Sequence, residues 1–138
     1  MSLEEVLSKS SSLKDRLGDA ERMVMTEAEI CLAAGIPFNQ EDRIPYRSKN
    51  LAAQQKIAEF KSRVSYTRAR ATYNKDHYHG ELLDDDDVKD YSQKDKWPLL
   101  VSRDAKFRDL LNIEAELLAL HEYLDNLLWS LKTALNKS

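Results

Sequence analysis

The stretch LLNIEAELLALHEYLDNLLWSLKTAL, residues 110–135, decides the fold of this chain. Its apolar residues recur at alternating spacings of three and four, which is the repeat of a helix packed along one side. The repeat consists of Leu110, Ile113, Leu117, Leu120, Leu124, Leu127, Leu131 and Ala134. A second row beside it contains Leu111, Leu118, Leu128 and Leu135. So wide a stripe can pack against two neighbours, and we predict a helix over about residues 102–136 with Ser102 as its N-cap.

A second long helix is predicted from about residue 48 to residue 75, because residues 48–74 contain neither Gly nor Pro. The same heptad spacing joins Ala53, Ile57, Phe60, Val64, Thr67 and Ala71 into a thin coiled-coil seam. We therefore predict an all-α fold built on a long antiparallel helical hairpin of residues 48–75 and 102–136.

Smaller helices are predicted before the hairpin. Ser2 followed by Glu5 is a capping-box pattern, and a further helix over residues 19–34 should end at Gly35-Ile36-Pro37. We expect a single helical domain over residues 1–138. Its parts are N-terminal helices (1–34), a connector (35–47), the basic helix (48–75), an acidic loop (76–101) and a Leu-rich oligomerisation helix (102–136).

Composition limits the class of protein. The chain has 138 residues, of which 33% are charged, and a single cysteine, so no disulfide forms within it. No apolar run approaches the roughly 18 residues of a membrane span, and the N-terminus lacks an apolar signal core. We expect a cytoplasmic protein without a membrane partner. A highly charged helical chain of this length buries little apolar surface alone, which favours a homo-oligomer.

Charge is distributed unevenly along the chain. Between Arg43 and Lys75 there are nine basic residues and one acidic residue, Glu59. Residues 76–95 contain eight acidic residues and two lysines, although the whole chain carries a net charge of only −3. A basic block beside an acidic block indicates a polyanionic partner more than a catalyst.

On a helix, the basic residues form two rows that flank the apolar seam. One row contains Lys49, Lys56, Arg63 and Arg70, and the other contains Lys61, Arg68 and Lys75. Tyr66 and Tyr73 lie beside the first row, on the face of Arg63 and Arg70. Guanidinium groups neutralise phosphates and tyrosine rings stack on unpaired bases, so the pattern predicts binding of single-stranded DNA. The predicted DNA-binding residues are Lys56, Lys61, Arg63, Tyr66, Arg68, Arg70, Tyr73 and Lys75.

Two alternatives stay open for the basic residues. They can pair with acidic residues of a neighbouring helix, as in many coiled coils. The candidates on the last predicted helix are Glu114, Glu116, Glu122 and Asp125. The acidic loop can also fold over the basic face. The alternative function is therefore binding of an acidic protein partner. A protein with this function is a non-enzymatic helical adaptor, a virion-assembly protein or a host-inhibitor protein.

No catalytic or cofactor site is predicted. His77 and His79 lie beside the acidic run, but a His-x-His pair in an irregular segment does not fix metal geometry, so we predict no metal. Cys31 lies in an apolar stretch and is expected to be a small buried hydrophobe. The chain has only three glycines, none of them clustered, which excludes a phosphate-binding loop. We therefore expect a protein that is not an enzyme.

The stretch Tyr66–Tyr73, YTRARATY, resembles the LKAR-type motif of the UvsY family, the recombination mediators of tailed phages. The motif positions Leu, Lys, Ala, Arg and the following aromatic residue correspond in order to Thr67, Arg68, Ala69, Arg70 and Tyr73. Further along, Tyr78-His79-Gly80 is similar to the family's Tyr-x-Gly. Residues 101–104, VSRD, are similar to the entry into its final helix.

The resemblance covers roughly residues 50–136 and implies a function. Members of the family are ring-like homo-oligomers of more than two subunits that bind single-stranded DNA in recombination and DNA repair. The implied partners are a RecA-class recombinase and a single-stranded-DNA-binding protein, in the host cytoplasm if the chain is phage-encoded. On this basis Arg68 and Arg70 are the main DNA contacts. The resemblance also implies that the last helix assembles the oligomer, and the leucines expected to do so are Leu117, Leu120, Leu124, Leu127, Leu128 and Leu131.

Overall fold

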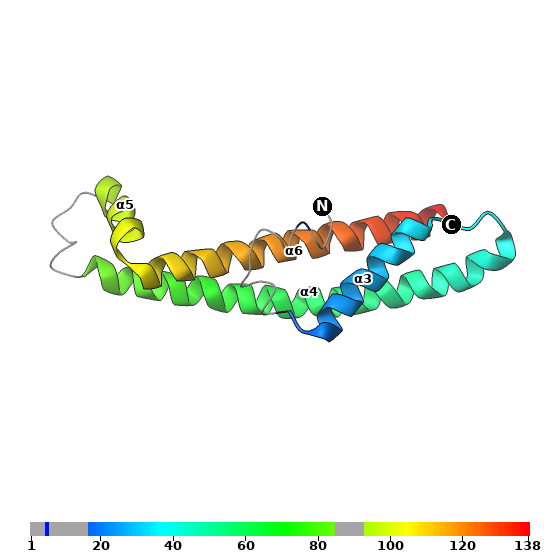
Figure 1. The fold of residues 1–138 in the computed structure, drawn as a ribbon, viewed down its shortest axis with the longest axis horizontal. Helices are drawn as coiled ribbons and strands as arrows, with labels where there is room; N and C mark the ends of the chain where they lie inside the picture. Colours follow the sequence, from blue (N-terminus) through cyan, green and yellow to red (C-terminus); the bar gives the residue numbers. More distant parts are fainter. Residues whose placement is uncertain (1–4, 6–16, 85–92) are drawn as a thin grey trace. The chain divides into compact units, whose positions relative to one another are not determined.

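The computed structural model describes Glu5 and residues 17–84 and 93–138, and all regular structure among them is helical. The helices are α3 (Asp19–Ala34), α4 (Gln40–Leu83), α5 (Gln93–Arg103) and α6 (Ala105–Lys137) (Figure 1). This confirms the all-α prediction and its long helix pair. The predicted capping box at the N-terminus and the centre of the acidic run, residues 85–92, lie outside the described residues.

The chain divides into two compact units. The first consists of the described residues of Met1–Ser65 together with Ala119–Ser138, and the second of those of Tyr66–Leu118. Helices α4 and α6 each contribute to both units, so the division does not test the prediction of a single domain.

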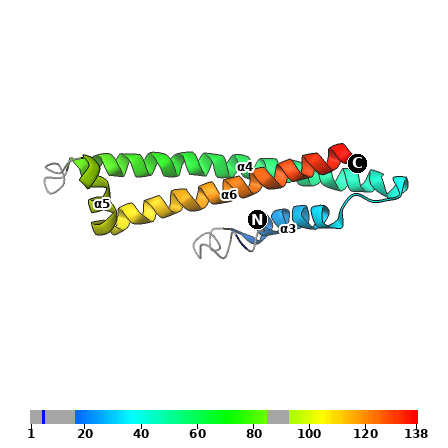
Figure 2. The same ribbon diagram turned by 90° about the horizontal axis from the view of Figure 1, so that it is seen from above.

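In the first unit, α3 and the adjoining parts of α4 and α6 lie side by side (Figures 1 and 2). Three side chains at the centre, Met25, Ile57 and Leu124, are fully buried, one from each helix. The core also contains the predicted seam residues Ala53, Phe60, Val64, Leu120, Leu127 and Leu131. The two heptad patterns therefore pack against each other, and α3 completes the core.

Asn50 is a fully buried polar residue in this core. Its side-chain Nδ2 donates to the carbonyl oxygen of Leu131 at 3.0 Å, and its Oδ1 accepts from Gln54 Nε2 at 2.6 Å. Farther along α4, Lys61 pairs with Asp125. From Asn50 to Lys61 the residue numbers on α4 increase, while those of their partners on α6 decrease from Leu131 to Asp125. The two helices are therefore antiparallel in this unit. Leu118 and Lys132 stand one heptad to either side of Asp125, so a heptad shift would cost Lys61 its carboxylate partner, and this pair favours the observed register.

In the second unit, Leu100 of α5 and Phe107 of α6 form a small buried core, to which Tyr78 and Leu82 of α4 are packed. Asp104 separates α5 from α6. Its Oδ1 accepts from the backbone N–H of Phe107 at 2.8 Å, and its Oδ2 accepts from the Tyr78 hydroxyl at 2.9 Å. Asp104 is therefore the N-cap of α6 and also holds α4.

The prediction of Ser102 as the N-cap of the last helix is wrong. The Ser102 hydroxyl donates instead to the carbonyl oxygen of Leu99, within α5. Its side chain is thereby used inside the preceding helix. The cap position passes to Asp104, whose carboxylate accepts from the backbone N–H of Phe107 in the first turn of α6.

The predicted ends of the first long helix also need correction. Gly35, with φ of +73°, ends α3 as expected, but the connector stops before Gln40 and Pro45 lies inside α4. A proline this close to the helix start removes a single intrahelical hydrogen bond. At the other end α4 continues to Leu83, because Tyr78 and Leu82 pack on the second core. Pro98 likewise lies inside a helix, α5, where a loop was predicted.

Replacing Leu124 by alanine should destabilise the protein strongly. Leu124 is fully buried, and truncating such a side chain costs about 2–5 kcal/mol through lost burial and the cavity left behind. Leu51→Ala is the matched control, because Leu51 is 54% exposed in the same unit and its truncation should cost within about 0.5 kcal/mol. Urea unfolding followed by circular dichroism measures both. Equal effects would contradict the core assignment.

Candidate nucleic-acid interface

A row of exposed aromatic and cationic side chains lies on α4 in the second unit. Tyr66 and Tyr73 are 66% and 68% exposed, and the Arg70 guanidinium lies 5.9 Å from the centre of the Tyr66 ring. The Tyr73 ring lies 6.1 Å from the His77 ring. Spacings of three and four residues place these side chains on one helix face. We call Tyr66, Arg70, Tyr73 and His77 the Tyr–Arg row.

Arg70 provides the positive charge of the Tyr–Arg row. Among the described residues, no carboxylate forms an ion pair with it, and its recorded contact is the cation–π contact with Tyr66. A cation–π contact of this kind leaves the N–H donors of the guanidinium available. The row therefore places these donors between two exposed rings, which suits a phosphate flanked by bases.

Arg68 does not share the face of Arg70. Two residues along a helix correspond to a rotation of about 200°, so the two side chains project from nearly opposite sides. Arg68 is accordingly half-buried, whereas Arg70 is exposed. The structure thus separates two arginines that the resemblance groups together, and a DNA contact by Arg68 stays a prediction.

Lys75 is engaged within the second unit. Its side chain is only 15% exposed, and its Nζ lies 3.2 Å from Asp76 and 3.2 Å from Glu114. Burial by itself lowers the pKa of Lys75, but its hydrogen bonds to Asp76 and Glu114 raise the pKa above the ordinary value. The ammonium is therefore charged and already neutralised, which makes Lys75 poorly placed for phosphate.

The other predicted DNA-binding residues belong to the first unit. Lys56 lies 3.5 Å from Glu27, and Lys61 pairs with Asp125. The Arg63 guanidinium lies 5.6 Å from the centre of the Phe60 ring. Glu114 and Asp125, two of the four acidic residues expected as alternative partners, thus accept lysines within the chain. The pairing alternative is confirmed for Lys61 and Lys75.

A cavity of about 390 Å³ adjoins the Tyr–Arg row in the second unit. Tyr73 and His77 line it together with Tyr78 and, from α6, Lys106, whose Nζ lies 4.4 Å from the centre of the Tyr78 ring. Sequence reasoning did not select Lys106, because it lies far from the basic block and no local pattern marks it. The cavity adds a second cation, Lys106, and a third, half-buried tyrosine beside the Tyr–Arg row.

The two histidines have different surroundings. His77 Nδ1 lies 3.3 Å from Glu81, one turn further along α4. The His79 ring lies 5.3 Å from the Phe107 ring and 5.4 Å from the Trp97 ring. His79 therefore packs in an aromatic cluster that joins α4, α5 and α6, while His77 stays in the Tyr–Arg row.

The leucines predicted to assemble an oligomer lie in the interior of this chain. Leu120, Leu124, Leu127 and Leu131 are buried in the first unit, Leu128 is packed against them, and Leu117 is buried in the second. Their apolar surface is covered by the same chain. A role for them between subunits stays a prediction. The large apolar side chains that α6 exposes in the described part of the chain are Leu118 and Trp129.

No protein-family model, curated protein or solved structure matches the chain. The resemblance to the UvsY family therefore stays an expectation. Among the described helices, none combines the length and the apolar character that crossing a membrane requires.

Removing the Lys61 ammonium should raise the pKa of Asp125. The hydrogen bond from Lys61 is the main cause that holds this pKa below its ordinary value of 3.8. The pair therefore stabilises the fold above pH 3.8, and this contribution is lost as pH falls through the lower folded-state pKa. In Lys61→Met, a carboxyl-carbon NMR titration should move the Asp125 pKa toward 3.8. Lys132→Met, at an exposed lysine of α6, should leave it unchanged. An unaltered titration in Lys61→Met would contradict the pairing.

Proposed function

We propose that this protein binds single-stranded DNA through the Tyr–Arg row. The observation that carries the proposal is the arrangement of Arg70 between two exposed tyrosines, with no carboxylate of the described residues paired to it. Such a face attracts phosphates electrostatically and offers rings on which unstacked bases can lie. Rings of this kind accept any base, so the preference is for strand form and not for sequence.

The contacts divide by chemistry. Arg70 neutralises a phosphate, and Lys106 at the adjoining cavity contacts a neighbouring one. Tyr66 and Tyr73 each stack on a base, worth about 1–3 kcal/mol per base. A single chain offers few such contacts, so its affinity is modest. Several copies in a homo-oligomer engage one strand together and raise the overall affinity through effective concentration.

The biological role that we propose is recombination mediation, and it is supported by the resemblance of Tyr66–Tyr73 to the UvsY motif. In this role the oligomer gathers a strand coated by single-stranded-DNA-binding protein. It presents the strand to a RecA-class recombinase, which displaces the coating protein. The chain performs no covalent chemistry in this scheme. Its contribution is to hold the strand in a form that favours the recombinase.

A second candidate function is favoured by the ion pairs. Lys56, Lys61 and Lys75 each hold a carboxylate within the chain. Basic side chains of this helix thus already serve protein carboxylates, and Arg70 can serve one from a partner in the same way. The protein is then a non-enzymatic helical adaptor for an acidic protein. Such a protein has no affinity for DNA at moderate salt, which distinguishes the two candidates.

Arg70→Ala should weaken binding of labelled oligo-dT, measured by fluorescence anisotropy over a salt series. Loss of one phosphate contact should reduce the slope of log affinity against log salt by about 0.7. Arg108→Ala, at an exposed arginine of α6 in the same unit, is the charge-matched control and should keep the slope. Equal slopes in both variants, or equal affinity for duplex and single strand, would contradict the site.

Tyr73→Ala should weaken binding with little change in the salt slope, because stacking releases no counterions. The expected loss is about five- to 150-fold, from about 1–3 kcal/mol per base. Tyr73→Phe keeps the ring and should retain most of the affinity. A loss of the same size in both variants would show that the hydroxyl, and not stacking, makes the contact.

A further inference from the structure

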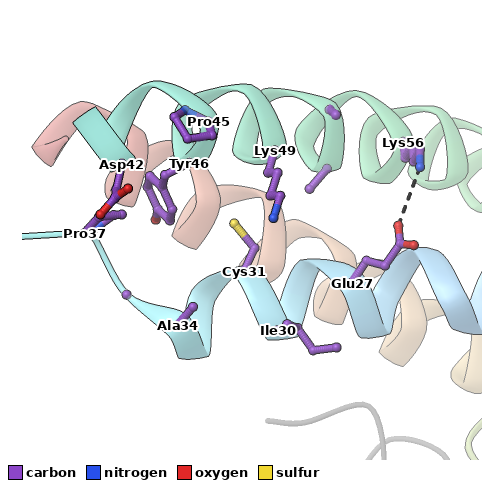
Figure 3. A pocket seen from close by; sticks show the side chains of 13 residues that line it. Glu27, Ile30, Cys31, Ala34, Pro37, Asp42, Pro45, Tyr46, Lys49 and Lys56 are labelled. Carbon is purple, nitrogen blue, oxygen red and sulfur yellow. Dashed lines mark ion pairs between the residues drawn. The ribbon is translucent and has the colours of Figure 1, made fainter. Parts of the chain in front are cut away.

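The first unit contains a cleft between α3 and the first turns of α4, far along the sequence from the Tyr–Arg row (Figure 3). Its volume is about 780 Å³, within the range of about 300–1,000 Å³ typical of small-ligand sites. The walls are mainly apolar and include Ile30, Pro45 and Ala52. Size and lining therefore suit the body of an apolar small molecule.

Two polar groups face the cleft without a partner. Tyr46 is only 7% exposed, and its hydroxyl has no hydrogen-bond partner in the part of the chain that the structure describes. Lys49 lies one turn further along α4 and forms no ion pair with the described residues. Figure 3 shows both side chains directed into the space between the helices. A buried hydroxyl without a partner is unfavourable, so this corner is suited to a ligand with hydrogen-bonding capacity.

Cys31 of α3 faces Lys49 across the cleft (Figure 3). Burial raises the pKa of its thiol, and the Lys49 ammonium opposes that rise. Both side chains line the cleft, so the ammonium is available to its interior. Cys31 is the single cysteine of the chain, so its reactivity reports on this cleft alone.

The other charged side chains that line the cleft limit the net charge that a ligand can carry. Glu27 and Lys56 form an ion pair at one end, and Asp42 lies at the other (Figure 3). Lys56 neutralises Glu27, so Asp42 opposes a dianionic phosphate, while Lys49 in the middle attracts a single negative charge. A monovalent carboxylate therefore fits this balance better than a phosphate group does.

We infer that this cleft binds a carboxylic acid with an apolar body. The carboxylate accepts hydrogen bonds from the Lys49 ammonium and the Tyr46 hydroxyl. The apolar body lies along Ile30 and Ala52. This site is independent of the proposed DNA function, since it shares no residue with the Tyr–Arg row.

The test is calorimetric titration of the full chain with decanoate, kept below the concentration at which it forms micelles. Lys49→Met keeps the side-chain stem and removes the charge, so the affinity should fall about tenfold. Lys132→Met is the matched control on α6 and should bind as the unaltered protein does. Tyr46→Phe should lower the affinity several-fold, and circular dichroism checks that each variant is folded.

A second readout uses Cys31. Decanoate should slow the reaction of its thiol with N-ethylmaleimide, whereas 1-decanol at the same concentration should protect it much less. No heat of binding and no protection would overturn the proposed site. Equal protection by decanol, or full affinity in Lys49→Met, would overturn the carboxylate recognition.

Discussion

The antiparallel register of α4 against α6 in the first unit is the constraint on which the other features depend. Ile57 and Leu124 are fully buried within it, Asn50 donates to the carbonyl of Leu131 across it, and Lys61 pairs with Asp125. An apolar seam alone tolerates a shift by one heptad, but the Lys61–Asp125 pair does not, because Leu118 and Lys132 stand one heptad to either side of Asp125. This register determines which polar side chains of α4 lie in the interior and which are exposed to solvent.

That distribution explains why the basic residues of α4 divide into two groups. Lys61 and Lys75 lie next to the buried seams of their own units and meet the carboxylates of Asp125 and Glu114. Arg70 is exposed, contacts the Tyr66 ring, and forms no ion pair within the part of the chain that the structure describes. The first group stabilises the fold and the second is available for a partner. The net charge of the basic stretch does not distinguish the two groups, whereas the face of α4 on which each residue lies does.

The sequence predicts part of this structure well. The two heptad seams and the limits of α3 follow from local spacing and from Gly35, and the shared face of Tyr66, Arg70 and Tyr73 follows from helix geometry. The extent of α4 was missed because the acidic residues after Lys75 obscured its apolar face. Three features have no signal in the local sequence. They are the N-cap of α6, the position of Lys106 beside the Tyr–Arg row, and the cleft at Tyr46. The position of Lys106 and the cleft each depend on segments that are distant in sequence, and no local pattern favours Asp104 over Ser102 as the cap.

NMR of ring-labelled tyrosines, with and without oligo-dT, tests the central claim most directly. The account predicts that the ring signals of Tyr66 and Tyr73 shift on titration, while those of the buried Tyr46 and Tyr123 stay in place. The shifts should disappear when salt releases the DNA. Unchanged signals at both exposed rings, under conditions where the oligonucleotide is bound, would place the interface elsewhere and contradict the proposed site.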